Sequence, residues 1–324
     1  MITALRIAAT ISAAAFGLTA GPASSEPAVP NLVKVVVPFS PGASNDVFGR
    51  ALAAKLSKEL GVNVIVENKP GAGGTIGTSD VATSKPDGAT LLFTSVSFVT
   101  HAAMYDKLPY DPIKSFSPVA VVATGPMVMV TGKSSPHSSA AAFLDDAKAR
   151  RGELHYGSAG IGSIGQMSSE LLNLQLGTDM VHIPYKGISN AVTDMVGGRL
   201  ETMITTPASV SGPLAAKDIR VLATTSAERS KFFPDVPTLS EIVPGYKVDV
   251  WWGMYAPANT PPELVAKYNA AIRKISSQPD MREMFAKEAT EPTDMDPAAA
   301  GEYVKAELIR WKELATERNI VAQK

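Results

Sequence analysis

The chain has 324 residues, is 45% hydrophobic, carries a formal net charge of −1 at pH 7 and contains no cysteine. This length is sufficient for one large or two medium domains with a sizeable core. The near-neutral charge argues against a nucleic-acid partner, which clustered Lys and Arg residues would bind. The missing cysteines exclude disulfides, thiolate metal sites and cysteine nucleophiles.

Residues 1–25, "MITALRIAATISAAAFGLTAGPASS", differ in composition from the rest of the chain. Arg6 is the only charge, an apolar stretch follows it, and the small residues at 23–25 suit a cleavage site. This layout predicts a secretory signal peptide. The apolar stretch is shorter than the roughly 20 residues that a membrane span needs. Without a cysteine for a lipid anchor, we expect an exported periplasmic protein that is not inserted in the membrane.

In the first part of the chain, short β-branched runs alternate with amphipathic patterns, which is typical of βαβ units. Gly61 is expected to end the first helix. The predicted elements are, in chain order, a strand at 33–39, a helix at about 45–60, a strand at 62–67, a second helix after "NKPGAGGTIGTSD", and strands at 89–95, 117–123 and 127–131.

The same order of elements begins again near Ser138, which we predict to cap a helix that runs to residue 149. Helices are expected to dominate the last quarter of the chain. The predicted elements are a strand at 154–158, a helix at about 163–176, a strand at 179–185, a helix at 189–198, strands at 200–206 and 219–226, an extended stretch at 248–257, and helices at 261–276, 279–288 and 297–318.

Two strand–loop–helix beginnings, at 33–60 and 154–176, predict two similar α/β lobes, each a mostly parallel sheet flanked by helices. We expect the chain to cross between the lobes near Thr131 and again near Trp251. Two lobes joined by two crossing segments form a hinge with a ligand cleft between them. The predicted lobes are residues 31–131 plus 252–324 (lobe 1) and residues 132–251 (lobe 2).

The segment "GSAGIGSIG" places Gly160, Gly162 and Gly165 in the dinucleotide pattern G-x-G-x-x-G. A Rossmann site also needs an acid at the carboxyl end of the next strand, to bind the ribose. The acid near this spacing, Asp179, precedes the predicted strand instead of following it. The absence of an acid at the required position therefore favours another use of this loop. A nucleotide-binding enzyme of similar fold is kept as an alternative.

Other catalytic patterns find little support in the sequence. The four histidines, at 101, 137, 155 and 182, are scattered, with no pair at metal-ligand spacing. Ser163 has Ile161 where a G-x-S-x-G hydrolase needs glycine. "TGKS" at 131–134 has Met127 where a phosphate-binding P-loop needs glycine. We therefore expect no catalytic residue, no metal site and no cofactor.

Three loops of small residues, "SPGASND", "GAGGTIG" and "SAGIGSIG", lead directly into predicted helices. Such a loop offers free backbone N–H groups, hydroxyl groups and the positive end of a helix dipole, which together bind carboxylate or phosphate. One loop of this kind could be merely a tight turn with a cap. Three of them, from two lobes that flank one cleft, indicate a binding site for a small anion.

With these loops the chain resembles the Bug-type substrate-binding proteins of tripartite tricarboxylate transporters. The resemblance covers residues 33–320 and rests on motifs that include "VVVPFSPGASND", "VIVENKPGAGGTIG", "YGSAGIGS" and "HIPYKGISNAVTDMVGGRLE". It implies a Venus-flytrap fold that closes on a small mono- or dicarboxylate, aliphatic or aromatic, and presents it to integral-membrane transporter subunits. It implies a monomeric receptor and not an enzyme. An exported sensor or scaffold protein is a further alternative.

The resemblance also implies which residues hold the ligand, through backbone N–H groups, hydroxyls and ordered water. Asp46 is interpreted as a cap and organiser of its loop, because two carboxylates repel. Ala43, Gln166 and Thr205 stand where the family often has Gly, His and Asp, which argues against an amino-acid ligand. The implied ligand-binding residues are Ser40, Pro41, Gly42, Ala43, Ser44, Asn45, Asp46, Ser95, Ser158, Ala159, Gly160, Ser163, Gln166 and Thr205.

Overall fold

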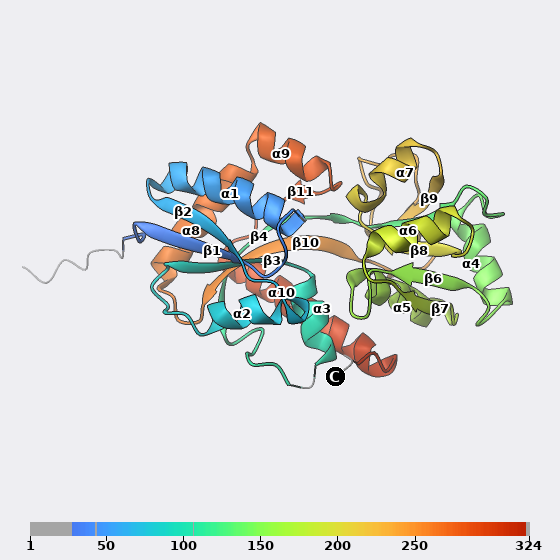
Figure 1. Ribbon diagram of the computed structural model, residues 1–324, viewed down its shortest axis with the longest axis horizontal. Helices are drawn as coiled ribbons and strands as arrows, with labels where there is room; N and C mark the ends of the chain where they lie inside the picture. The colour runs from blue at the N-terminus through green and yellow to red at the C-terminus, as the bar shows by residue number, and fades with distance from the viewer. Residues whose placement is uncertain (1–27, 43, 106, 322–324) are drawn as a thin grey trace, which may run out of the picture.

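The computed structural model describes residues 28–42, 44–105 and 107–321. In this part of the chain two β-sheets, each flanked by helices, form two lobes that lie side by side (Figure 1). This arrangement confirms the predicted two-lobed α/β fold. The predicted signal peptide lies outside the described residues.

The first lobe contains a six-stranded sheet in the order β11-β4-β10-β3-β1-β2. Strand β1 is buried at its centre, as the run "VKVVV" predicts, and it pairs in parallel with β2 and β3. β10 pairs antiparallel with both β3 and β4. The strands are β1 (Leu32–Val37), β2 (Asn63–Asn68), β3 (Thr90–Ser95), β4 (Phe116–Pro126), β10 (Asp249–Pro257) and β11 (Glu291–Pro292).

Helices cover both faces of this sheet (Figure 1). α1 buries Phe48, Leu52 and Leu56 at helical spacing. Each of the last three helices has a proline in its first turn, where its missing N–H costs no hydrogen bond. The helices are α1 (Ser44–Leu60), η1 (Ala72–Gly74), α2 (Thr75–Ala82), α3 (Ser97–Met104), α8 (Pro262–Ser276), α9 (Pro279–Ala286) and α10 (Pro297–Glu317).

The second lobe contains a five-stranded sheet in the order β7-β6-β8-β5-β9. β6 pairs in parallel with β7 and β8, whereas β5 pairs antiparallel with β8 and β9. Its elements are β5 (Val128–Gly132), α4 (Ala140–Ala149), β6 (His155–Ser158), α5 (Ile164–Leu176), β7 (Val181–Pro184), α6 (Ile188–Val196), β8 (Thr202–Thr205), η2 (Ala208–Val210), α7 (Ser211–Ala215), β9 (Ile219–Thr224) and η3 (Leu239–Glu241).

Several details differ from the sequence predictions. Both sheets are mixed rather than mostly parallel, because strands at the crossings between the lobes, β5 and β10, run against their neighbours. α4 is capped by Ser139, whose side chain accepts the N–H of Ala142 at 3.2 Å, and not by Ser138. The extended stretch at 248–257 is β10, an interior strand of the first sheet. α3, α7 and β11 were not predicted.

Two adjacent segments connect the lobes. β4 continues through Met127 into β5, and β10 begins beside the end of β4, where Asp249 pairs with Pro126. Thr225 joins the two segments, because its Oγ1 accepts the Met127 N–H at 2.8 Å and donates to the Val248 carbonyl at 2.6 Å. The two crossings thus lie side by side, and they are called the hinge below. The lobe boundaries near residues 131 and 252 stay a prediction.

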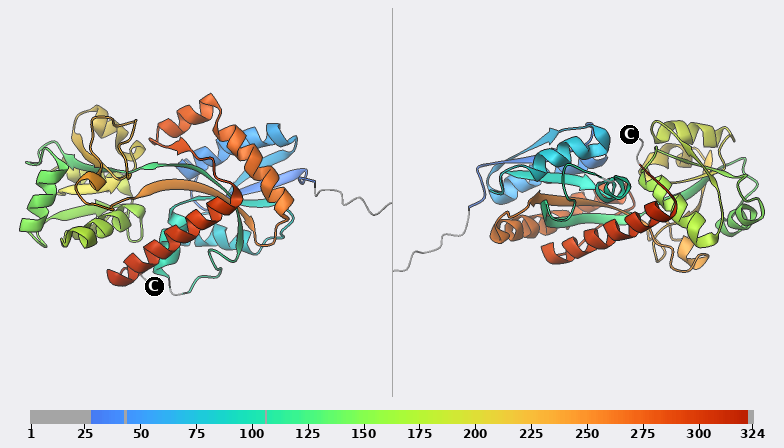
Figure 2. Two further views of the ribbon diagram at one scale, coloured as in Figure 1. Left: turned by 180° about the vertical axis from the view of Figure 1, so that it is seen from behind. Right: turned by 90° about the horizontal axis from the view of Figure 1, so that it is seen from below.

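The C-terminal half of α10 passes from the first lobe towards the second (Figure 2). Just beyond this helix, Arg318 forms an ion pair with Glu170 of α5 at 2.9 Å. The lobes therefore meet along α10 as well as at the hinge. No helix in the described ranges combines the length and the apolar character needed to cross a bilayer.

Candidate functional site

The first loop (residues 40–46) lies between β1 and α1 and is organised by Asp46. Gly42 has φ +90°, a conformation that favours glycine, and its N–H donates to Asp46 Oδ2 at 2.9 Å. Asp46 is 4% exposed and its Oδ1 also accepts from Asn68 and Arg50, each at 2.9 Å. Burial raises the pKa of Asp46, but the hydrogen bonds from Arg50, Gly42 and Asn68 together hold it below the ordinary value. As the sequence predicts, this carboxylate shapes the loop.

The other residues of the first loop differ in their exposure. Ser40 and Pro41 are exposed to solvent. Ser44 is the first residue of α1, and its Oγ donates to a carboxylate oxygen of Glu288. Ala43 lies outside the described residues.

Asn45 connects the first loop to the end of β3. Its Nδ2 is 3.5 Å from the Oγ of Ser95, and that oxygen lies 2.9 Å from the Oγ of Ser97 in the first turn of α3. The Oδ1 of Asn45 is buried and has no hydrogen-bond partner within the described ranges. A buried polar atom of this kind requires a partner, which a ligand or an ordered water can supply.

The second loop (residues 158–166) lies between β6 and α5 and is organised by two serines. Ser158 Oγ accepts the Gly160 N–H at 3.1 Å and lies 2.7 Å from Nε2 of His182 on β7. Ser163 caps α5: its Oγ donates to the Gly160 carbonyl at 2.7 Å and accepts the Gln166 N–H at 3.4 Å. The predicted residues in this turn are Ser158, Ala159, Gly160, Ser163 and Gln166.

The three glycines of the dinucleotide pattern have structural roles in the second loop. Gly160 and Gly162 have φ values of +123° and +77°, which glycine adopts without strain. A Cβ at Gly165 would lie 2.6 Å from the carbonyl oxygen of Ile204 on β8, so glycine lets α5 pack closely on this strand. Asp179, the acid near the ribose spacing, is in an ion pair with an arginine at 2.6 Å. The geometry therefore explains the glycines without a nucleotide.

Gln166 holds the second loop through its side-chain amide. It is 6% exposed, and its Oε1 accepts the Gly162 N–H at 2.7 Å. Because the amide oxygen is engaged, only the amide N–H groups of Gln166 remain for a ligand. A neutral donor of this kind suits an anionic ligand atom.

The lobes meet beside the second loop, where Gly162 packs on α3. A Cβ at Gly162 would lie 1.8 Å from Met104 Cε and 3.2 Å from His101 Cδ2. On its other side the His101 ring meets η1, because a Cβ at Gly73 would lie 2.9 Å from His101 Cε1. Burial lowers the pKa of His101 against an opposing hydrogen bond with the Gly73 backbone, so the ring is neutral at pH 7. The neutral imidazole of His101 therefore lies between η1 of the first lobe and the second loop of the second lobe.

Candidate residues of the two loops are thus connected through α3, where the lobes meet. Ser95 and Ser97 join the first loop to the start of α3, and Met104 at the end of α3 meets the second loop. Thr205, 4% exposed, follows Ile204 at the end of β8, where the N-terminus of α5 packs. The groups assembled here are backbone N–H groups, hydroxyls and amides, which bind an anion by hydrogen bonds. No three His, Asp or Glu residues in the described ranges are grouped so that they could hold a metal ion.

The sequence analysis missed three side chains beside these loops: Asn68, His101 and Glu288. Asn68 ends β2 beside the first loop, and its place at the end of a predicted strand could have indicated it. His101 was rejected as a metal ligand and interpreted as an ordinary surface or packed histidine. For Glu288 the sequence gives no signal, because its contact with Ser44 joins residues that are 244 positions apart.

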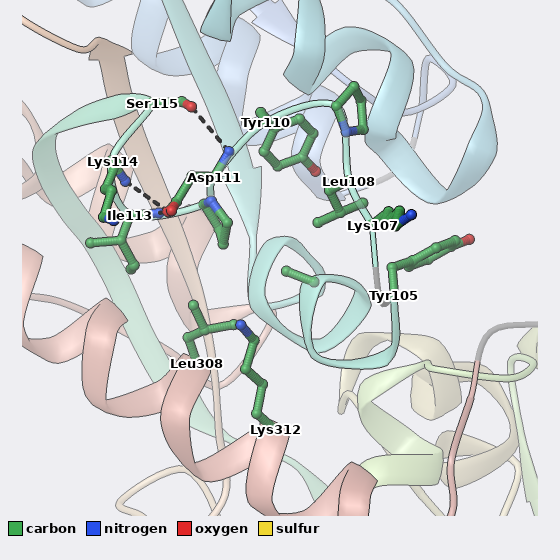
Figure 3. Close-up of a pocket in the computed structure, with 13 residues that line it drawn as sticks. Tyr105, Lys107, Leu108, Tyr110, Asp111, Ile113, Lys114, Ser115, Leu308 and Lys312 are labelled. Atoms are coloured by element: carbon green, nitrogen blue, oxygen red, sulfur yellow. Dashed lines mark hydrogen bonds between the residues drawn. The ribbon is translucent and has the colours of Figure 1, made fainter.

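A cavity of about 860 Å³ lies elsewhere, between the loop at 107–115 and α10 (Figure 3). Asp111 shapes this loop: it accepts N–H groups from Lys114 and Ile113 at 2.9 and 2.8 Å, which hold its pKa below the ordinary value although burial opposes this. Leu308 and Lys312 line the cavity from α10. None of the predicted ligand-binding residues lines it, so this cavity is separate from the candidate site.

Comparison with known proteins gives a family match over most of the chain. Residues 48–320 match the family described as "Tripartite tricarboxylate transporter family receptor". Protein BugT from Bordetella pertussis is 33% identical over 301 residues, which cover 92% of this chain and 92% of BugT.

Two solved structures resemble the whole fold. A protein of R. palustris solved with adipate is 32% identical, with a TM-score of 0.78, over 90% of this chain and 98% of that one. MatC from Rhodopseudomonas palustris, solved with bound malate, is 31% identical, with a TM-score of 0.74, over 87% of this chain and 98% of MatC.

Proposed function

This chain belongs to the tripartite tricarboxylate transporter receptor family, and we propose that it is a periplasmic receptor that captures a small carboxylate between its lobes. The ligand is a mono- or dicarboxylate, aliphatic or aromatic, and the closed receptor delivers it to the membrane subunits of a transporter. The relatives solved with adipate and malate support the carboxylate class.

The observation that carries this proposal is the pairing of two small-residue loops at helix N-termini, one from each lobe. The first loop precedes α1 and the second precedes α5. Helix N-termini present unpaired N–H groups and a positive partial charge, which favour a carboxylate. Because the loops belong to different lobes, a ligand held by both also holds the lobes together.

The charge of the candidate residues fits a carboxylate bound by neutral donors. None of them carries a positive charge, and the one acid, Asp46, is already paired with protein donors. Hydrogen bonds to a charged group contribute about 1.5–3 kcal/mol each. Two or three of them, with apolar burial, reach the roughly 8 kcal/mol of micromolar binding. No metal or redox group is needed for this affinity.

Thermal unfolding of residues 26–324 against a panel of mono- and dicarboxylates tests the proposal, with NAD, ATP and amino acids as controls. A carboxylate at 1,000 times its Kd stabilises the folded state by about 4 kcal/mol, which raises Tm by about 2 °C or more per kcal/mol. We expect one or a few carboxylates to give this shift. A shift with a nucleotide alone, or none with any carboxylate, would contradict the proposal.

A matched pair of variants on α5 locates the binding site. Gln166→Ala removes a donor of the second loop, whereas Gln175→Ala changes an exposed residue of the same helix. We expect the first substitution to weaken carboxylate binding about tenfold or more, which corresponds to the loss of one charge-assisted hydrogen bond, and the second to leave it unchanged. Equal effects of both would place the ligand elsewhere.

A further inference from the structure

A buried acid, Glu288, borders the candidate site from the first lobe. It follows α9 and is 5% exposed. The turn that carries it is fixed to the sheet, because β11 pairs with β4 and a Cβ at Gly125 would lie 2.5 Å from the carbonyl oxygen of Ala289. In Figure 1 the end of α9 lies on the side of the first lobe that faces α6 and α7. The sheet therefore fixes this turn, and the carboxyl group of Glu288 lies near Thr206 and Ala208 of the second lobe.

The carboxyl group of Glu288 has donors from both lobes around it. The Oγ of Ser44, in the first loop, donates to Oε1. From the second lobe, the hydroxyl of Thr206 and the N–H of Ala208 lie close enough to favour the ionised form. Oε2 is buried and has no hydrogen-bond partner in the described part of the chain. Among the described residues Oε2 thus makes no hydrogen bond of its own, although Thr206 and Ala208 lie near the carboxyl group.

The surroundings of Glu288 disfavour a second negative charge. Burial raises the pKa of Glu288 and so lowers the cost of protonating it, whereas Ser44, Ala208 and Thr206 oppose this effect and favour the ionised carboxylate. The nearest charge on the first loop, Asp46, is also an acid and is already paired with Arg50. Two carboxylates that share one site cannot both ionise freely. A ligand carboxylate next to Glu288 would have to share a proton with it, at a cost in affinity.

We propose that Glu288 sets the ligand preference on the side of the site bounded by Ser44 and Thr206: the ligand carries an uncharged hydrogen-bond donor there, such as a hydroxyl group, and not a second carboxylate. This inference rests on the proposed function. A hydroxyl group satisfies the unpartnered Oε2 without the uptake of a proton. The preferred ligands are therefore hydroxylated monocarboxylates.

Two series of matched ligands test this preference by calorimetry: butyrate, 4-hydroxybutyrate and succinate, and hexanoate, 6-hydroxyhexanoate and adipate. Each series keeps the chain length and changes only the end group. We expect the wild-type protein to bind the hydroxy acid about tenfold or more tightly than the diacid, as expected for like charges a few ångströms apart in a partly buried site.

Glu288→Gln and Glu288→Met both remove the acid, and Glu283→Gln on α9 changes an exposed acid nearby as a control. We expect the two Glu288 variants to bring the affinities of diacid and hydroxy acid to within about threefold, and the control to keep the wild-type ratio. Thermal unfolding of each variant verifies that it folds.

Two results would overturn the inference alone: a wild-type preference for the diacid, or a ratio that neither Glu288 variant changes while both ligands bind. If neither these acids nor any other carboxylate of the thermal panel binds the wild-type protein, the proposed function fails and the inference fails with it.

Discussion

Asp46 shows how a single residue can determine a loop that the ligand is expected to contact. Its carboxylate accepts hydrogen bonds from Gly42, Asn68 and Arg50 and is almost fully buried. Removal of the acid leaves the backbone N–H of Gly42 in the first loop and the side-chain amide of Asn68 at the end of β2 without a charged acceptor. Hydrogen bonds to charged groups are worth more than neutral ones, so this residue controls both loop shape and stability.

We predict that Asp46→Asn lowers the free energy of unfolding at pH 7 by about 1.5–3 kcal/mol. The pKa of Asp46 in the folded protein lies below the ordinary 3.8, so its contribution is complete above that value and is lost as the pH falls through the lowered pKa. The difference between wild type and variant should therefore shrink below about pH 4. Urea unfolding at pH 7 and at pH 3–4 measures it, and a difference that does not depend on pH would contradict the prediction.

At the scale of single residues, the sequence could predict those residues that shape the loop in which they lie. Gly42, Ser163 and the glycines of the second loop lie in loops that directly precede helices, so spacing alone indicates them. Ser139 rather than Ser138 caps α4 because adjacent serines offer the same chemistry and the helix start decides between them. Asn68 and Glu288 could not be paired with the first loop, since those contacts depend on how β2 and the turn after α9 pack in three dimensions.

At the scale of elements, α10 connects the C-terminus to the second loop through α5. Arg318 pairs with Glu170, and Glu170 accepts the Tyr156 hydroxyl at 2.6 Å. The Tyr156 ring stacks on His182, with ring centroids 5.0 Å apart, and His182 contacts Ser158. A series of contacts therefore runs from the end of α10 to the turn expected to bind the ligand.

We predict that Arg318→Ala destabilises the protein by about 2–4 kcal/mol, because it leaves the carboxylate of Glu170 largely buried without its cation. The double variant Arg318→Ala with Glu170→Gln should recover part of this loss, since no unpaired charge remains. Arg282→Ala, at an exposed position, is the control and should cost less than about 0.5 kcal/mol. If urea unfolding gives equal losses for Arg318→Ala and the control, the pair has no structural role.

The elements found from the sequence are those with strong periodicity and clear ends. α5, α8 and α10 combine a buried stripe with a cap or an initial proline, and α1 has a long buried stripe. α3 was missed because "SFVTHAAM" is short, carries β-branched residues and has no side-chain cap. The mixed pairing of the sheets could not be predicted either, because strand direction depends on where the chain crosses between lobes.

At the scale of the whole molecule, we expect the lobes to rotate about the hinge, with the contacts of α10 on the second lobe adjusting as they do so. Met127 and Thr225 hold the two crossing segments together, while the candidate site lies between the lobes. A ligand that contacts both loops should therefore shift the population towards the closed arrangement.

We predict that the carboxylate with the largest Tm shift shortens the mean distance between spin labels on the two lobes by several ångströms. It should also narrow the distribution of these distances. The chain has no cysteine, so Ala54→Cys on α1 and Ala141→Cys on α4, both exposed, can be labelled without background. Labels at Ala54 and Lys58, both on α1, are the control and should not respond. An unchanged distance between lobes on ligand saturation would contradict hinge closure.

The order of strands in the first sheet also has a consequence for how the chain acquires its structure in time. All five strands of the second sheet come from one continuous segment, residues 128–224, whereas the interior strand β10 of the first sheet comes from residues 249–257. A chain that is synthesised from its N-terminus therefore completes the second sheet first. β1, β2 and β3 remain without β10 until about three quarters of the chain has been synthesised, so the sheet that begins the sequence is the last to receive all its strands.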